Sequence, residues 1–189
     1  MYDLNKDWAV LNAAVPDLEG YLLSSELFLP LNAKKNISGM VSDERLSLGT
    51  VLLSQARLNA SDFSVRKADE LEVLNDSMKS LRMQWLSIWQ RKAALEFPAR
   101  LTMWQNYLEE AVDDRDRFKT YSYHVRWRAM LYLLAQEKGS HPLGPAEERL
   151  SVLDLRLKAV TRPADFTWDK ELASGFPEAI FWFLYRKPA

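Results

Sequence analysis

Residues 71–108 read LEVLNDSMKSLRMQWLSIWQRKAALEFPARLTMWQNYL, and their apolar pattern decides the fold. Apolar side chains recur at steps of three and four, the spacing that lines one face of an α-helix. They are Leu71, Leu74, Met78, Leu81, Trp85 and Ile88, followed by Leu101, Trp104 and Leu108. We therefore predict a long, tryptophan-rich helix over residues 65–112 on which the rest of the chain packs.

Pro98 interrupts this pattern and decides the shape of the predicted helix. A proline in a helix interior either kinks the helix or ends it. We favour a kink, because no glycine marks a helix end beside Phe97 and because the apolar phase continues beyond Pro98. The result would be a bent rod of about 70 Å, at ~1.5 Å per residue. The alternative is a helical hairpin that turns back at Pro98.

The flanking segments also carry helix signals, and they contain scarcely any strand pattern. Residues 122–138 are apolar on nearly all sides, which is typical of a buried helix at the centre of a core. Gly49 lies in the middle of a predicted helix, where we interpret it as a point of close approach to another helix. Further helices are predicted at 4–15, from Pro16, from Asp43, at 145–161 and from Pro177. The chain is therefore predicted to be a single all-α domain over residues 1–189, a bundle of six or seven helices.

Composition excludes several kinds of chemistry. The sequence has no cysteine, which removes disulfides, thiolate catalysis and cysteine-ligated metals. Its formal net charge of −1 supplies no general attraction to nucleic acid or to an anionic membrane. No apolar run is long enough to span a membrane, and the N-terminus does not resemble a signal peptide. We therefore expect a cytoplasmic protein.

One acidic cluster is a candidate metal site. Glu109, Glu110, Asp113 and Asp114 fall at helical spacings that let several carboxylates share a face, and such a face can hold Mg²⁺. All-α nucleotide pyrophosphohydrolases use acidic helices in this way, but they need a second acidic pair, for which residues 69–72 are the only dense candidate. The competing interpretation is that basic neighbours pair with these acids and that an aspartate caps the next helix. Those neighbours are Arg115, Arg117 and Lys119.

Other motifs point to packing rather than to chemistry. The two histidines, His124 and His141, have no partner at metal-ligand spacing, and we interpret His124 as a surface or packing residue. Arginines alternate with aromatic residues over 121–128, a pattern that can bind nucleic acid. We favour arginines that extend from a buried helix and pair with the acids at 109–116.

Three functions follow from these patterns, and no cofactor is predicted. The first is a non-enzymatic helical interaction or scaffold protein, because a rod of this length needs cover from a second copy or another protein. Its predicted contact residues are Trp85, Trp89 and Trp104. The second is a Mg²⁺-dependent nucleotide hydrolase that uses the acidic cluster. The third is a small-molecule binder with an aromatic pocket near Trp85, Trp104 and Trp127.

Overall fold

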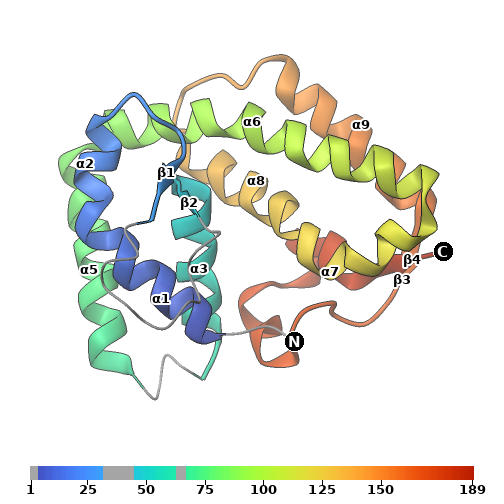
Figure 1. Ribbon diagram of the computed structural model, residues 1–189, viewed down its shortest axis with the longest axis horizontal. Helices are drawn as coiled ribbons and strands as arrows, with labels where there is room; N and C mark the ends of the chain where they lie inside the picture. Colours follow the sequence, from blue (N-terminus) through green and yellow to red (C-terminus); the bar gives the residue numbers. More distant parts are fainter. Residues whose placement is uncertain (1–3, 32–44, 63–66) are drawn as a thin grey trace.

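A computed structural model shows an all-α protein and describes residues 4–31, 45–62 and 67–189 (Figure 1). Within these ranges, the α-helices are α1 (Leu4–Ala14), α2 (Leu18–Leu23), α3 (Leu48–Ala60), α5 (Ala68–Gln84), α6 (Leu86–Asp113), α7 (Tyr121–His124), α8 (Arg126–Glu137), α9 (Pro145–Val160) and α10 (Glu178–Phe181). Short 3₁₀-helices are η1 (Val15–Asp17), η2 (Arg115–Thr120), η3 (Lys170–Gly175) and η4 (Trp182–Tyr185). Two small antiparallel pairs join β1 (Leu29–Pro30) to β2 (Arg45–Leu46) and β3 (Thr161–Pro163) to β4 (Arg186–Pro188).

The predicted rod over 65–112 is two helices, and the chain turns at a different residue from the one we predicted. The break falls at Trp85, whose φ of −116° and ψ of 34° leave the helical region. Pro98 lies inside α6, so neither a helical hairpin nor a chain break occurs there. The indole N–H of Trp85 donates to Glu19 Oε1 at 2.9 Å, which ties the break to α2. α5 therefore runs beside α1 and α2, while α6 crosses the molecule (Figure 1).

This turn lets the chain cover its own apolar stripe. Leu71 and Met78 of α5 are buried, and Trp89, Leu101 and Trp104 of α6 are at most 1% exposed. Buried apolar residues from α1 to η4 form one contiguous cluster. The stripe therefore does not require a second chain to cover it.

Helix α3 begins later than we predicted, at Leu48 rather than near Asp43, which lies outside the described residues. Ser47 is its N-cap, and the Ser47 hydroxyl accepts a hydrogen bond from the Thr50 N–H at 3.2 Å. The preceding residues are extended, because Leu46 pairs with Leu29 in the first small antiparallel pair. The N-cap bond then starts the helix directly after that strand.

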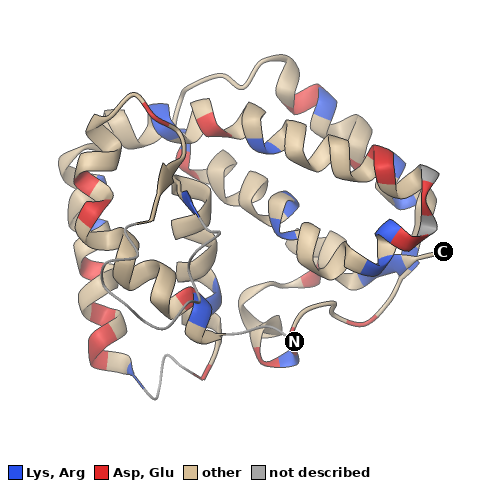
Figure 2. Cartoon of the chain, in the orientation of Figure 1, with Lys and Arg blue, Asp and Glu red and all other residues tan. Residues whose placement is uncertain are grey.

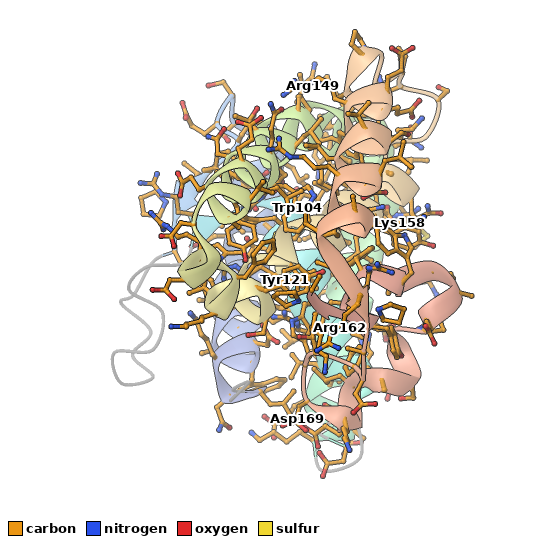
Figure 3. The ribbon with its side chains drawn as sticks, turned by 90° about the vertical axis from the view of Figure 1, so that its right-hand side faces the viewer. Trp104, Tyr121, Arg149, Lys158, Arg162 and Asp169 are labelled. Carbon is orange, nitrogen blue, oxygen red and sulfur yellow. The ribbon has the colours of Figure 1, made fainter. Side chains whose placement is uncertain are left out.

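The predicted central position of residues 122–138 is confirmed for α8, which lies between α3 and α6. α8 ends at Glu137, and Gly139 follows with a φ of 57°, the left-handed conformation that favours glycine after a helix end. Pro145 starts α9 as predicted, with two glutamates in the first turn. α9 packs against α6 on the side away from α3, and Trp104 lies in the interior between α6 and α9 (Figure 3).

The C-terminal segment, for which we predicted a helix from Pro177, closes the core but is not one helix. Its backbone passes through α10 and η4 and then pairs with β3 as strand β4, a partner that the sequence pattern did not reveal. The side chains of Phe176, Phe183 and Leu184 are completely buried. Across the described residues, we find no helix with both the length and the apolar character that crossing a bilayer requires.

Candidate functional site

A cavity of about 620 Å³ lies where four distant parts of the chain meet. Its walls come from α1, α3, the α7–α8 junction and the segment that leads into η3. A volume of this size suits a small molecule, since ligand sites usually measure roughly 300–1,000 Å³. The lining residues are Lys6, Asp7, Val10, Thr50, Leu53, Ser54, Arg57, Ser122, Tyr123, Arg126, Met130, Thr167, Trp168, Asp169 and Lys170.

The α1–α3 wall is held by a buried carboxylate. Asp7 is only 7% exposed, and its Oδ1 accepts a hydrogen bond from the Ser54 hydroxyl at 2.8 Å. Arg57 Nη1 lies 4.0 Å from Asp7 Oδ2, and this guanidinium is also buried. These contacts position α1 against α3 and place charged groups on the cavity wall.

Two arginines of the cavity lie on aromatic rings. The Arg57 guanidinium carbon is 4.0 Å from the centre of the Trp168 ring, and that of Arg126 is 4.0 Å from the centre of the Tyr123 ring. Arg126 also donates to the Tyr123 hydroxyl at 2.6 Å. The Trp168 indole N–H donates to the Ser122 carbonyl at 2.8 Å, so the ring beneath Arg57 is itself fixed. Stacking of this kind fixes a guanidinium in place without neutralising it.

The cavity lining carries an excess of positive charge. Its basic residues are Lys6, Arg57, Arg126 and Lys170, and its acidic residues are Asp7 and Asp169. Four positive and two negative groups leave a formal charge of +2, in a chain whose net charge is −1 and whose acidic and basic residues are both spread over the helices (Figure 2). Asp169 and Lys170 are exposed, and Asp169 lies at the opposite end of the molecule from Arg149 (Figure 3). Lys6 and Arg126 are half-buried, and Asp7 and Arg57 are buried.

A buried ion pair lies behind the floor of the cavity. Arg100 Nε donates to Glu96 Oε1 at 2.8 Å, and the Glu96 side chain is completely buried. The Glu96 carboxylate also accepts from the Ser47 hydroxyl at 2.8 Å and from the Gly49 N–H at 3.0 Å. Arg100 Nη2 donates to Thr50 Oγ1 at 3.1 Å, which holds this lining hydroxyl in place. The Glu96 carboxylate therefore accepts from a backbone N–H in the first turn of α3, where the helix dipole also favours a negative charge.

The close approach predicted at Gly49 is confirmed. A Cβ atom at this position would lie 2.7 Å from Glu96 Oε1 and 3.4 Å from Met130 Cβ. Gly49 therefore permits α3 to pack against both α6 and α8. The contact also places Met130 at the level of the first turn of α3.

The described acids of the predicted cluster each have a different protein partner. Glu109 Oε1 accepts from Gln105 at 2.8 Å, and Glu110 pairs with Arg117 at 3.2 Å. Asp114 Oδ1 caps η2 by accepting the Asp116 N–H at 2.9 Å. The Asp113 side chain lies outside the described part of the structure. Among the residues described, no group of three or more potential metal ligands comes together.

The tryptophans singled out from the sequence lie in different environments. Trp89 and Trp104 are core side chains in this structure, and Trp85 is half-buried at the break between α5 and α6. Trp104 and Trp127 instead belong to an aromatic stack that runs through Tyr107 and His124. His124 is thus a packing residue, 4.3 Å from the Tyr107 ring centre. Whether the three predicted tryptophans contact a partner stays untested.

The arginines at 121–128 do not all pair with the upstream acids as we predicted. Arg128 forms a two-pronged ion pair with Asp154 of α9, with both nitrogen–oxygen distances at 2.8 Å. Its guanidinium also lies over Phe183, 4.5 Å from the ring centre. Arg126 faces the cavity instead. Partners on α9 and in the C-terminal segment are distant in sequence, so the local pattern could not reveal them.

The sequence did contain one overlooked signal for the cavity. Asp7 falls three residues after Leu4 and four before Leu11, so it interrupts the apolar face of its own helix. Ser54 interrupts the face formed by Val51 and Leu58 in the same way. Two polar interruptions on neighbouring helices are typical of a buried polar contact between them.

The chain matches no protein-family model, no curated protein and no solved structure. Its function must therefore be argued from the chemistry of the site.

Proposed function

We propose that the protein binds a small anionic molecule in the cavity between α1, α3 and α8. The observation that carries this proposal is the pair of ring-stacked arginines, Arg57 and Arg126, on the wall of a cavity of about 620 Å³ with a formal charge of +2. This is the small-molecule function anticipated from the sequence, at a different set of aromatic residues. Trp168 and Tyr123 take the place of the predicted tryptophans.

An anion suits this cavity for two physical reasons. A guanidinium presents several donors in a fixed fork, which matches the oxygens of a carboxylate or phosphate. A partly buried site also screens charge less than water does, so the attraction is stronger there than on an open surface. Hydroxyl groups of Thr50, Ser122 and Thr167 line the same space and can donate further hydrogen bonds.

The other functions stay predictions. Glu110 and Asp114 of the proposed Mg²⁺ site already have protein partners, which weakens the case for a hydrolase. We predicted a homodimer or another protein partner because a long helix over 65–112 would leave its apolar face uncovered. Other parts of the same chain cover that face. The cytoplasmic location has no observation for or against it.

The proposal is tested by calorimetric titration of the protein with carboxylates and inorganic phosphate. Replacing Arg126 by Gln removes a positive charge while its ring partner, Tyr123, is 51% exposed and tolerates the change. Hydrogen bonds to charged groups contribute about 1.5–3 kcal/mol, so we expect Arg126→Gln to weaken anion binding about tenfold or more.

Arg91→Gln is the matched control, because Arg91 is exposed on α6 and does not line the cavity. It removes the same charge and should leave the affinity within about twofold, the size of a screened surface effect. An equal loss of affinity in both variants would show that binding does not occur in the cavity. Absence of binding by any anion would reject the proposal itself.

A further inference from the structure

The cavity is layered, with charged groups nearer its mouth and apolar groups at its floor. The charged layer contains Asp7 on α1, Arg57 on α3 and Arg126 on α8. One helical turn further in, the same helices present Val10, Leu53 and Met130, beside the Thr50 hydroxyl, which already accepts a hydrogen bond from Arg100. Contacts between the helices support these two layers. Asp7 accepts a hydrogen bond from Ser54 and lies near Arg57, which aligns the charged layer of α1 and α3. Met130 lies beside Gly49, which places it near the start of α3. The inner residue has the higher number on α1 and the lower number on α3, and the two helices do run in opposite directions (Figure 1).

We infer that the ligand is an organic monoanion with a short apolar body. This inference rests on the proposed function and names the class of molecule that the same cavity takes. The anionic group binds in the layer of Arg57 and Arg126, and the body extends inward against Val10, Leu53 and Met130. A phosphate ion or acetate fills only the charged layer and leaves the apolar floor without a partner.

The floor is built to receive apolar atoms. Val10, Leu53 and Met130 are each at most 3% exposed, and the methionine side chain adapts readily to the shape of a ligand. The step from Arg126 to Met130 is four residues of helix, or about 6 Å at the usual rise. The apolar body is therefore a few carbon atoms long.

The layering also selects against a second negative charge. A dianion of the same length would bring its far carboxylate against Val10, Leu53 and Met130, which have no hydrogen-bond donor, and burial of a poorly paired charge is costly. In the charged layer, the buried Asp7 carboxylate already occupies one side. The cavity therefore favours a monoanion over a dianion of equal length.

A series of carboxylates tests this inference on the unmodified protein. We expect the affinity measured by calorimetry to rise from acetate to butanoate to hexanoate. Burial of one methylene contributes about 0.8 kcal/mol, which corresponds to roughly a threefold to fourfold gain per added methylene. Adipate, which has six carbons and two carboxylates, should bind at least about tenfold more weakly than hexanoate.

The outcomes separate this inference from the proposed function. If all the carboxylates bind with equal affinity, or adipate binds as tightly as hexanoate, the inference fails while anion binding stands. If uncharged hexanamide binds as tightly as hexanoate, or no compound binds, both fail. As a second arm, Met130→Gln places an amide at the floor and should flatten the dependence on chain length. Met83→Gln is its control, because Met83 is an exposed residue of α5 that does not line the cavity, and this variant should keep the dependence. The unmodified protein decides the question if Met130→Gln does not fold.

Discussion

Gly49 allows the first turn of α3 to reach the buried Glu96 carboxylate. Its N–H donates to Glu96 Oε2 at 3.0 Å, and the other carboxylate oxygen lies where a Cβ atom would come within 2.7 Å. Burying an ionised carboxylate is costly unless its hydrogen bonds are satisfied. The absence of a side chain at Gly49 therefore makes room for the Glu96 carboxylate, which accepts the N–H of Gly49 at the start of α3.

Replacing Gly49 by Ala should destabilise the protein by about 1–3 kcal/mol, the usual cost of overpacking a buried site. Urea denaturation followed by circular dichroism measures this change. Gly20→Ala is the control, because Gly20 lies in α2 and nothing is within 4 Å of its added Cβ. That substitution should stabilise by roughly 0.5–1 kcal/mol through helix propensity. Changes of the same sign in both variants would contradict this explanation.

His124 should make the protein less stable as the pH falls. Burial lowers the pKa of its imidazole, and the nearby positive charges of Arg126 and Arg117 lower the pKa further. In the unfolded chain the imidazole has a pKa of about 6.5. As the pH falls below about 6.5, the unfolded chain therefore binds a proton more readily than the folded chain, and the free energy of unfolding decreases. Above that pH, this contribution is constant because the imidazole is neutral in both states.

Replacing His124 by Phe keeps a ring beside Tyr107 and removes the titration. We expect the melting temperature of the variant to fall less than that of the unmodified protein between pH 7.5 and pH 5. The difference between the two melting temperatures should be unchanged between pH 7.5 and pH 8.5. Parallel curves across the acidic range would show that His124 does not contribute.

At the scale of elements, spacing predicted helices well and predicted their ends poorly. The apolar spacing of 71–88 runs through Trp85 without interruption, but the helix breaks at Trp85, where the indole N–H donates to Glu19, a residue 66 positions away. Asp43 looked like a helix start, yet Ser47 is the cap because Leu46 is held in a strand pair. Local residue patterns cannot show such long-range partners.

The proline inside α6 leads to a test at the same scale. Pro98 is exposed and has no N–H to donate to the Ala94 carbonyl, the position four residues earlier in the helix. A proline in a helix interior destabilises the folded state by roughly 3 kcal/mol or more. It also restricts the unfolded chain, and removing that restriction destabilises the protein by about 0.4–1 kcal/mol. Pro98→Ala should therefore stabilise the protein by about 1–3 kcal/mol in urea denaturation. Destabilisation would instead show that packing depends on the backbone shape that Pro98 imposes.

At the scale of the whole molecule, the cavity could not be predicted because its walls come from four separate segments. Asp7, Arg57, Arg126 and Trp168 are far apart in sequence, and only the packing of α1, α3 and α8 brings them together. The sequence pattern did show that polar residues, Asp7 and Ser54, interrupt apolar helix faces. It could not show that two of these interruptions face each other and that an arginine and a tryptophan from later in the chain complete the wall.

The last 25 residues connect the two halves of the fold. Trp168 lies beneath Arg57 of α3, the Ser174 hydroxyl donates to the Ala60 carbonyl at 3.3 Å, and the Phe183 carbonyl accepts from the Tyr121 hydroxyl at 2.6 Å. This segment therefore contacts both the N-terminal helices and the α7–α8 region. Its role in stability should be comparable to that of a core helix.

A chain that ends after Ala164 should not fold. The deleted segment contains six large apolar side chains that are at most 9% exposed, and burial of each contributes about 1.5–3 kcal/mol. They are Trp168, Leu172, Phe176, Phe181, Phe183 and Leu184. Their combined contribution matches or exceeds a typical net stability of about 5–15 kcal/mol. We expect the truncated chain to lack near-ultraviolet circular dichroism and a cooperative urea transition, whereas a chain that lacks only Ala189 should retain both. A cooperative transition in the truncated chain would show that the helices before residue 164 form a sufficient core by themselves.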